Sequence, residues 1–291
     1  MKISLLQMTC VPQPDANLAH AEHLARQAAA EGAEVIVLPE LYRSLYFCQR
    51  EDAELFDLAE PLDGPTNQTF QAVARETGTV IITSFFERRA PGLYHNTAAI
   101  IDTDGSIAGL YRKMHIPDDP AFYEKFYFTP GDLGFKATPT AKGRIGVLIC
   151  WDQWYPEAAR LTALCGADLL VYPTAIGWHP AEKSSHGASQ REAWMTIQRS
   201  HAIANGVFMV SANRVGHEVL TPGTPGLEFW GTSFIADPFG VILAQGSTDT
   251  EQIVSADLNL HRIEETRRGW PFLRDRRIDA YADITRRYID P

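Results

Sequence analysis

Short apolar runs alternate with longer, more polar segments along the chain. Runs of this kind occur in MKISLLQMTC (residues 1–10), VIVLP (35–39) and LLVYP (169–173). An apolar run of about four to eight residues is typical of a strand buried in a sheet. The longer segments between the runs have room for helices, so the pattern predicts an α/β protein in which helices cover at least one face of a sheet.

The pattern of the first half recurs in the second half. GAEVIVLPE (32–40) matches GADLLVYPT (166–174) in its Gly-Ala-acid start, its apolar run and its proline. Further along, NTAAIIDTDGSIAG (96–109) aligns with GTSFIADPFGVILA (231–244), and each predicts a β-hairpin whose turn contains an acid and a glycine. The two matches indicate an internal duplication.

The duplication defines a common order of elements. TGTVIITSFFE (77–87) is similar to NGVFMVSANR (205–214), and each predicts the end of a helix followed by a strand. The shared order is strand, helix, strand, long loop, helix, strand and hairpin, once over residues 1 to about 111 and again from about 144 to 258. Because the hairpins add antiparallel strands, each sheet is expected to be mixed.

Two such layers that pack sheet to sheet form a four-layer α-β-β-α sandwich. We therefore expect one domain over residues 1–260, followed by a C-terminal tail over residues 261–291. In this layout Glu40 lies just past the second strand of the first half, and Cys150 ends the first strand of the second half. Strand ends are where α/β proteins usually place their chemistry, which makes both residues candidates for a site.

Composition and charge argue against several classes of protein. The chain has 291 residues, is 45% hydrophobic and carries a net charge of −10, which argues against a nucleic-acid-binding function. The arginine-rich segment RRGWPFLRDRR (267–277) has acids in and around it, which favours a solvated segment or a subunit contact. No apolar run approaches the about 18 residues of a membrane helix, and the start of the chain turns polar too early for a signal peptide. We expect a cytoplasmic protein that does not bind membranes.

The cysteines show no metal or disulfide pattern. The chain has four cysteines without a short paired spacing, so we predict reduced thiols and no metal site. Cys10, Cys48 and Cys165 are expected in the core, since free cysteine is among the most buried residue types. The sequence has no glycine-rich phosphate-binding motif, and we expect no cofactor.

Three further motifs carry candidate chemistry: VLPELY (37–42), YRKMHIP (111–117) and ICWDQWYPE (149–157). With a glutamate, a lysine and a cysteine in this order, they resemble the nitrilase, or carbon-nitrogen hydrolase, superfamily. The resemblance extends from LLQMTC (5–10) to RGWPFLRDRR (268–277), and it implies the same α-β-β-α fold as the repeat. Within the superfamily, the chain is most similar to the branch that hydrolyses N-carbamoylputrescine, through the segments FYEKFYFTPGD, CWDQWYPEAAR, YPTAIG and HAIANG.

The resemblance implies a role for each motif residue. A thiol with an ordinary pKa of about 8.5 is only slightly ionised at neutral pH, so it needs a base to attack an amide. Glu40 is expected to carry the proton and Cys150 to be the nucleophile. Lys113 and the backbone N–H of Trp151 are expected to stabilise the negatively charged intermediate. Glu124 is expected to support the lysine as a fourth member of the site.

The segment that follows YPTAI departs from this branch. Relatives tend to have GSEP there, with an acid that faces the substrate amine, whereas this chain has GWHP. Thr174, Trp178 and His179 are candidate substrate-binding residues in this part of the chain. Glu182 and the rings of Trp178 and Trp154 are alternatives for binding a substrate amine, because acids and aromatic faces accept cations.

The expected reaction is hydrolysis of a carbon-nitrogen bond in a small linear amide or carbamoyl compound. The resemblance favours N-carbamoylputrescine, which would give putrescine, CO2 and ammonia. Alternatives are N-carbamoyl-β-alanine, an ω-amide, a nitrile, or a non-catalytic scaffold or ammonia-supplying module. Measured ammonia release by the purified chain separates the enzyme from the scaffold.

The C-terminal tail predicts assembly. Past Leu258 the repeat has ended, but the chain still carries apolar residues without a counterpart in the repeated plan: Trp270, Phe272, Leu273, Ile278 and Tyr281. Superfamily relatives form dimers, and two-fold dimers are the commonest soluble oligomers. We therefore expect a homo-oligomer built from two-fold dimers, in which the tail crosses onto a neighbouring subunit; the alternative is that the tail folds back on its own sandwich.

Overall fold

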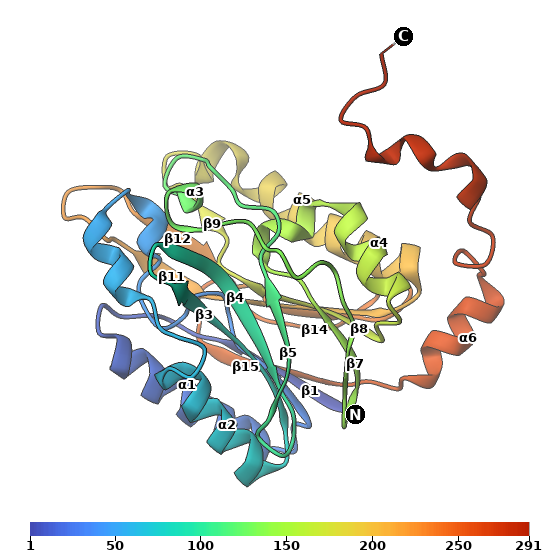
Figure 1. Cartoon of the computed structure of the whole chain (residues 1–291), viewed down its shortest axis with the longest axis horizontal. Helices are drawn as coiled ribbons and strands as arrows, with labels where there is room; N and C mark the ends of the chain where they lie inside the picture. Colours follow the sequence, from blue (N-terminus) through green and yellow to red (C-terminus); the bar gives the residue numbers. More distant parts are fainter. Residues whose placement is uncertain (291) are drawn as a thin grey trace.

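Two six-stranded sheets lie between two layers of helices in the computed structural model, which describes residues 1–290 (Figure 1). The first sheet has the strand order β15-β1-β2-β3-β4-β5. Its strands are β1 (Lys2–Gln7), β2 (Val35–Val37), β3 (Val80–Ala90), β4 (Leu93–Ile101), β5 (Ile107–Arg112) and β15 (Gln252–Asp257). Helices α1 (Pro14–Ala30) and α2 (Pro65–Thr77) cover the outer face of this sheet.

The second sheet repeats this arrangement with the order β14-β13-β10-β8-β7-β6. Its strands are β6 (Thr138–Thr140), β7 (Gly143–Val147), β8 (Leu169–Thr174), β10 (Phe208–Asn213), β13 (Phe234–Ala236) and β14 (Ile242–Gln245). Helices α4 (Pro156–Leu164) and α5 (Lys183–Asn205) cover its outer face. In each sheet three neighbouring strands are parallel and the others are antiparallel. The predicted four-layer sandwich with an internal repeat is confirmed.

Alternation along the strands builds two apolar layers. In β2, Val35 and Val37 belong to the core between the two sheets, whereas Ile36 packs toward α1 and α2. Successive side chains of a strand point to opposite faces, so a fully apolar strand can serve both layers. The predicted helix ends are also present: Gly78 after α2 has φ +65° and Gly206 after α5 has φ +58°, a left-handed conformation that glycine adopts without strain.

One strand differs from the predicted repeat. The second repeat was expected to extend to residue 258, but β15 leaves the second half and pairs antiparallel with β1 in the first sheet. The equivalent place beside β7 is taken by β6, which precedes the second repeat. Each of these strands covers an edge of the parallel strands that would otherwise have unpaired backbone groups.

A small third sheet was not predicted. It has the order β11-β12-β9, with β9 (Gly177–Trp178), β11 (Val215–Glu218) and β12 (Leu227–Trp230). Residues 177–178 follow the end of β8 and residues 215–230 lie between β10 and β13. Short helices complete the loops at this end: η1 (Phe47–Gln49), η2 (Ala53–Leu58), α3 (Glu124–Tyr127) and η3 (Cys150–Trp154).

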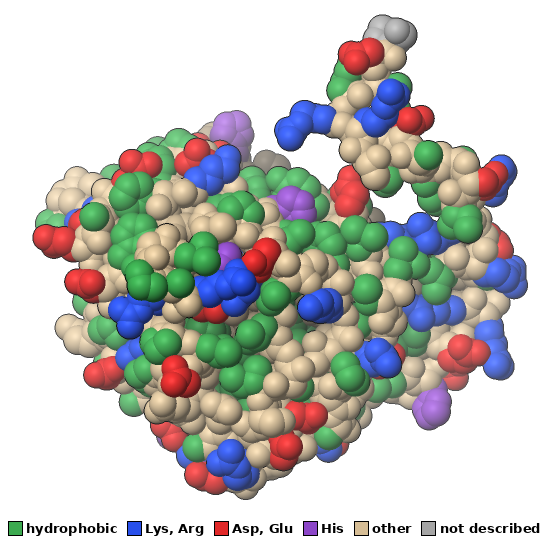
Figure 2. Space-filling model, in the orientation of Figure 1, with side chains coloured by type: hydrophobic (Ala, Val, Ile, Leu, Met, Phe, Trp, Pro, Cys, Tyr) green, Lys and Arg blue, Asp and Glu red, His purple; other side chains and the backbone are tan. Residues whose placement is uncertain are grey.

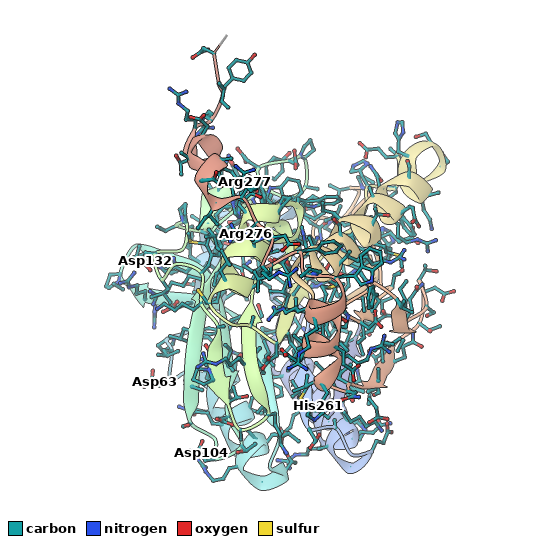
Figure 3. All side chains as sticks on the ribbon, turned by 90° about the vertical axis from the view of Figure 1, so that its right-hand side faces the viewer. Asp63, Asp104, Asp132, His261, Arg276 and Arg277 are labelled. Carbon is teal, nitrogen blue, oxygen red and sulfur yellow. The ribbon has the colours of Figure 1, made fainter. Side chains whose placement is uncertain are left out.

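The C-terminal segment leaves the sandwich after α6 (His261–Gly269). Ile263 and Thr266 of α6 are buried, and Arg267 donates to the carbonyl of Asn205 at the end of α5 (3.2 and 3.0 Å). Beyond α6 the chain continues through η4 (Ile278–Ala280) and η5 (Ala282–Thr285), where Tyr281 and Ile284 line a hollow shared with α4, and its end extends away from the body (Figures 1 and 2). Figure 3 shows Arg276 and Arg277 on this extension. The domain boundary at residue 260 remains a prediction.

In residues 1–290, no helix combines the length and the apolar character needed to cross a bilayer.

Candidate active site

The three motif residues lie just past the ends of their strands. Glu40 follows β2, Cys150 follows β7, and Lys113 directly follows β5. The Lys113 N–H donates to the Asn96 carbonyl at 2.9 Å, which continues the β4–β5 pairing by one residue. The Glu40 N–H donates to the carbonyl of Thr174 at 3.2 Å, so the end of β2 is tied to the end of β8 in the other sheet. The site therefore forms where the two repeats meet.

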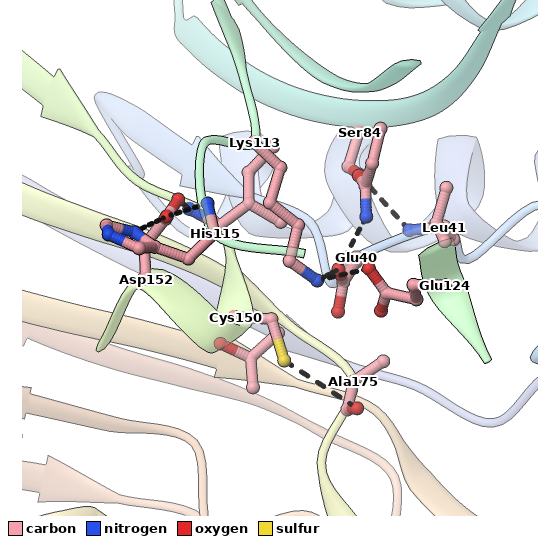
Figure 4. Close-up of polar contacts among 12 residues, drawn as sticks. Glu40, Leu41, Ser84, Lys113, His115, Glu124, Cys150, Asp152 and Ala175 are labelled. Atoms are coloured by element: carbon pink, nitrogen blue, oxygen red, sulfur yellow. Dashed lines mark hydrogen bonds and ion pairs between the residues drawn. The ribbon is translucent and has the colours of Figure 1, made fainter. Parts of the chain in front are cut away.

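Lys113 lies between two carboxylates (Figure 4). Its Nζ is 2.7 Å from Glu40 Oε1 and 2.6 Å from Glu124 Oε2, and all three side chains are at most 1% exposed. Asn96 Nδ2 also donates to Glu40 Oε1, at 2.7 Å. Glu40 Oε2 is buried and has no hydrogen-bond partner among the described residues. One oxygen of Glu40 is thus held and the other is available to accept a proton.

Burial and charge set the protonation of this group. Burial lowers the pKa of Lys113, but the nearby charges of Glu124 and Glu40 outweigh it and raise that pKa well above its ordinary value. Burial raises the pKa of Glu124 to about 7, and the charge of Glu40 adds to this, although Lys113 opposes it. Lys113 is therefore an ammonium ion at neutral pH.

Cys150 is the first residue of η3 and lies in a strained turn that follows β7. Its φ is +40°, in the left-handed region that costs a non-glycine residue about 1–3 kcal/mol. Its Sγ lies 3.8 Å from the carbonyl of Ala175 (Figure 4). Burial raises the pKa of the thiol well above its ordinary value and the charge of Glu40 adds to this, while Lys113 opposes it. The resting group is a thiol, so its attack on a substrate needs a base.

Asp152 holds this turn in place. Its Oδ2 accepts hydrogen bonds from the Ile149 N–H (2.9 Å) and the Tyr111 hydroxyl (2.7 Å), and its Oδ1 accepts one from the His115 N–H (3.0 Å). The His115 ring nitrogen Nδ1 also lies 2.7 Å from Oδ1. Asp152 therefore fixes the turn of Cys150 to the loop that carries Lys113. Asp152 lies within the motif ICWDQWYPE, but the sequence alone does not indicate that it joins these segments.

A pocket of about 530 Å³ opens over Cys150. Aromatic side chains line its walls and Asp119, Glu182 and His179 are among its polar residues; the aromatic residues are Phe122, Trp151, Trp154 and Trp230. Asp119 was not singled out from the sequence, although it lies in the acidic DDP segment five residues before Glu124.

The structure separates the predicted substrate-binding residues into two groups. Trp151 and His179 line the pocket. Thr174 is fully buried and its hydroxyl donates to the Tyr172 carbonyl at 3.0 Å. Trp178 is 7% exposed, and its indole N–H donates to the Gly187 carbonyl at 2.9 Å, which directs it into the core. Neither Thr174 nor Trp178 is among the residues that line the pocket.

The other cysteines differ from one another. Cys48 is buried in an apolar cluster, as predicted, and Cys10 is partly buried. The prediction of a core position for Cys165 is wrong: it is exposed, because it caps the C-terminus of α4, where the chain turns outward.

A buried thiol beside a carboxylate–ammonium pair, in a four-layer α-β-β-α sandwich, is typical of a hydrolase that works through a covalent cysteine intermediate. The chain belongs to the carbon-nitrogen hydrolase family, whose model matches residues 2–268, and thus to the nitrilase superfamily. It is an amidohydrolase similar to N-carbamoylputrescine amidases: the enzyme of that name from Arabidopsis thaliana is 45% identical over 96% of this chain and 93% of its own length.

Other relatives and solved structures are also similar to this chain over nearly its whole length. A citrullinase from Francisella tularensis is 39% identical over 99% of each chain. The crystal structure of a carbon-nitrogen hydrolase from Helicobacter pylori G27 is 48% identical, covers 99% of each chain and has a TM-score of 0.96. A mutant of the amidase from Nesterenkonia sp. AN1, 25% identical over 96% of this chain and 94% of its own, with a TM-score of 0.73, carries the acetamide moiety of fluoroacetamide covalently added at its active-site cysteine. The protein is a carbon-nitrogen hydrolase with an active-site cysteine.

Proposed function

We propose that the protein hydrolyses N-carbamoylputrescine to putrescine, CO2 and ammonia, with Cys150 as the nucleophile. The observation that carries the proposal is the Lys113 ammonium held between Glu40 and Glu124, beside a thiol that lines a pocket. The 45% identity to a plant N-carbamoylputrescine amidase supports this substrate.

The first step forms an S-carbamoyl intermediate, a thiocarbamate, on Cys150. Cys150 Sγ attacks the carbamoyl carbon while its proton passes to Glu40 Oε2, the oxygen without another partner. The carbonyl electron pair moves to the oxygen, where Lys113 Nζ and the backbone N–H of Trp151 stabilise the charge. When the carbonyl re-forms, the carbon-nitrogen bond breaks and the departing nitrogen takes the proton from Glu40.

The second step releases the enzyme. Glu40 takes a proton from a water molecule as the water oxygen attacks the carbonyl carbon of the thiocarbamate. The carbon-sulfur bond then breaks and the thiolate recovers a proton from Glu40. The product is a carbamic acid, which loses CO2, so the net products are an amine, ammonia and CO2.

The lining of the pocket suits a cation. N-carbamoylputrescine ends in an ammonium group, and the pocket offers Asp119, Glu182 and several aromatic faces as partners for it. Among the described residues that line the pocket there is no lysine or arginine. These acids replace the acid that the GWHP segment lacks.

The predicted substrate-binding residues take different parts in this proposal. Trp151 and His179 contact the substrate, since both line the pocket. Thr174 acts through its carbonyl, which accepts from the Glu40 N–H. Trp178 supports the pocket lining indirectly, because its ring packs against that of Trp230, a lining residue, with centroids 5.4 Å apart.

Citrulline is the second candidate, because a citrullinase is 39% identical over 99% of each chain. It carries the same ureido group but ends in an amino acid, in which Asp119 and Glu182 attract the ammonium group and repel the neighbouring carboxylate. N-carbamoyl-β-alanine and ω-amides also end in a carboxylate. The pocket therefore favours the amine-ended compound over all three.

The test is a comparison of substrates and of cysteine variants. For the purified chain, kcat/KM for N-carbamoylputrescine is expected to exceed that for citrulline by at least about tenfold, the effect of about 1.4 kcal/mol; a reversed ratio contradicts the substrate. Cys150→Ala is expected to abolish ammonia release, whereas Cys165→Ser, at an exposed site, leaves it unchanged. Mass spectrometry is expected to find the covalent adduct on Cys150, and an adduct on another cysteine contradicts the mechanism.

A further inference from the structure

A buried ion pair lies next to the site without belonging to it. Arg214, directly after β10, is 0% exposed and Glu218, at the end of β11, is 3% exposed. Arg214 Nη1 lies 2.8 Å from Glu218 Oε1 and 3.0 Å from Oε2. A buried pair of this kind costs desolvation on both sides, so it is weak as a source of stability and calls for another role.

The guanidinium of Arg214 holds the turn that carries Glu40. Its Nη2 donates to the backbone carbonyls of Glu40 and Leu41, both at 2.8 Å, and its Nη1 donates to the Ser44 carbonyl at 3.3 Å. Leu41 has φ +49°, a strained conformation for leucine. The turn needs these donors, because its carbonyls point into the protein and not toward water.

Glu218 reaches the second carboxylate through Tyr46. Its Oε2 accepts a hydrogen bond from the Tyr46 N–H at 2.6 Å. The Tyr46 hydroxyl in turn donates to Glu124 Oε1 at 2.6 Å. The ring of Tyr46 packs against Phe122 and Phe229, and the Arg214 guanidinium lies over Phe229 with its carbon 5.2 Å from the ring centroid. One ion pair therefore contacts the supports of both acids beside Lys113.

We infer that Arg214 and Glu218 are a positioning pair, which fixes Glu40 and Glu124 on either side of Lys113 across the junction of the two repeats. The inference rests on the proposed roles of Glu40 and Glu124. Arg214 and Glu218 come from the second half, whereas Glu40, Tyr46 and Lys113 come from the first half. The sequence does not reveal the link, since Arg214 is 174 positions from Glu40.

Arginine is needed here for its shape. Its planar fork donates at once to three carbonyls and a carboxylate, and a lysine ammonium at the end of a flexible stem cannot match that geometry. Arg214→Lys keeps the charge but loosens the turn of Glu40. A displacement of about 1 Å at a reacting group can cost about 100-fold in rate. The loss is expected in kcat, because neither residue lines the pocket and substrate binding is not touched.

The experiment compares Arg214→Lys with Arg267→Lys in the full chain. Arg267 also donates to a buried backbone carbonyl, that of Asn205, but it lies on α6 and does not line the pocket. We expect Arg214→Lys to lower kcat about 100-fold with KM changed less than about threefold, and to slow alkylation of Cys150 by iodoacetamide. Arg267→Lys is expected to keep both rates. A folded Arg214→Lys variant with parental kcat and alkylation overturns the inference.

A second variant tests the link from Glu218 through Tyr46 to Glu124. It remains a test of the inference if Arg214→Lys does not fold. Tyr46→Phe removes only the hydroxyl that donates to Glu124. Because that hydrogen bond stabilises the carboxylate form, its loss is expected to move the acid limb of the kcat profile to higher pH; an unmoved profile with parental kcat overturns the inference. A failure of the proposed function looks different: Cys150→Ala would then stay active, whatever the Arg214 and Tyr46 variants do.

Discussion

Lys113 depends for its charge on two acids that differ in their other partners. Glu40 receives Lys113 and Asn96 on one oxygen and leaves the second oxygen without a partner. Glu124 uses both oxygens, one for Lys113 and one for the Tyr46 hydroxyl. The two carboxylates therefore suit different tasks, proton transfer for Glu40 and support of the ammonium for Glu124.

The support by Glu124 depends on pH. Burial raises its pKa to about 7, so the carboxylate that Lys113 needs is fully formed only above that pH and is lost below it. We expect kcat/KM of the parent to rise with pH through about 7. Glu124→Gln removes the titrating group and one charged hydrogen bond, so it should flatten this limb and lower kcat/KM by about 10- to 100-fold, which corresponds to about 1.5–3 kcal/mol. A matched profile of Glu264→Gln, on exposed α6, controls for general effects of charge.

An acid limb that persists unchanged in Glu124→Gln contradicts this assignment and points to a different titrating group.

The site residues within the motifs could be predicted from the sequence, whereas the residues that hold them in place could not. Glu40, Lys113, Glu124 and Cys150 stand in distinctive local sequences, and the fold brings them together. Asn96, Tyr46, Arg214 and Glu218 act through contacts made only after folding, between segments as far apart as 174 positions. A local sequence pattern does not indicate such a contact.

At the scale of elements, β7 must lie close to α4 for Cys150 to be placed correctly. Gly146 in β7 allows this approach. A Cβ atom there would lie 2.2 Å from Thr162 Cγ2 and 3.0 Å from the Ala167 Cβ. Neither of these atoms is the far end of a flexible side chain, so the helix would have to move.

Gly146→Ala is therefore expected to destabilise the protein. Overpacking of this kind costs about 1–3 kcal/mol, which chemical denaturation measures as a lower midpoint. Gly269→Ala is the control, because a Cβ at that position has no neighbour within 4 Å. Equal midpoints for the parent and Gly146→Ala would show that α4 does not constrain β7.

The repeated elements were predictable because each apolar strand carries its own signal. The third sheet was not, since β9 has two residues and β11 and β12 have four each, too short for a periodic pattern. The pairing of β15 with the first sheet was not predicted, for another reason. Its sequence QIVSAD predicts a strand, but nothing in it specifies which of the two sheets it joins.

At the scale of the whole molecule, apolar surface is concentrated near the C-terminus. The outer face of α4 and α5 exposes Leu161 (46%), Leu164 (45%) and Ile203 (38%). A hollow of about 550 Å³ next to this face is lined by Leu161 and Leu164 together with Tyr281 and Ile284 of the tail. The tail itself exposes further apolar residues: Trp270 (58%), Phe272 (45%), Ile278 (74%) and Tyr288 (74%). Contiguous apolar surface of this kind marks an interaction site.

We propose that the occupant of this surface is a second copy of the chain. The tail pairs several of its charges internally, Arg274 with Asp275 (2.9 Å) and Arg277 with Asp279 (2.6 Å), so it presents apolar groups with few free charges to a partner. A tail that extends away from its own body can reach a neighbour (Figure 2). In a two-fold dimer the same patch serves both subunits, so each tail would cover the α4–α5 face of the other.

Light scattering on four chains, the parent and three variants, tests this proposal. The parent is expected to be at least a dimer, and a chain that ends after Gly269 is expected to be smaller; this truncation keeps α6, whose Ile263 and Thr266 are buried in the body. Leu161→Asp is expected to weaken assembly because it puts a charge on the covered face, whereas Val11→Asp, 42% exposed in the loop before α1, should not. A strictly monomeric parent contradicts the dimer. Unchanged assembly after truncation contradicts a role of the tail in the dimer. The contact would then be the α4–α5 face alone, which Leu161→Asp tests.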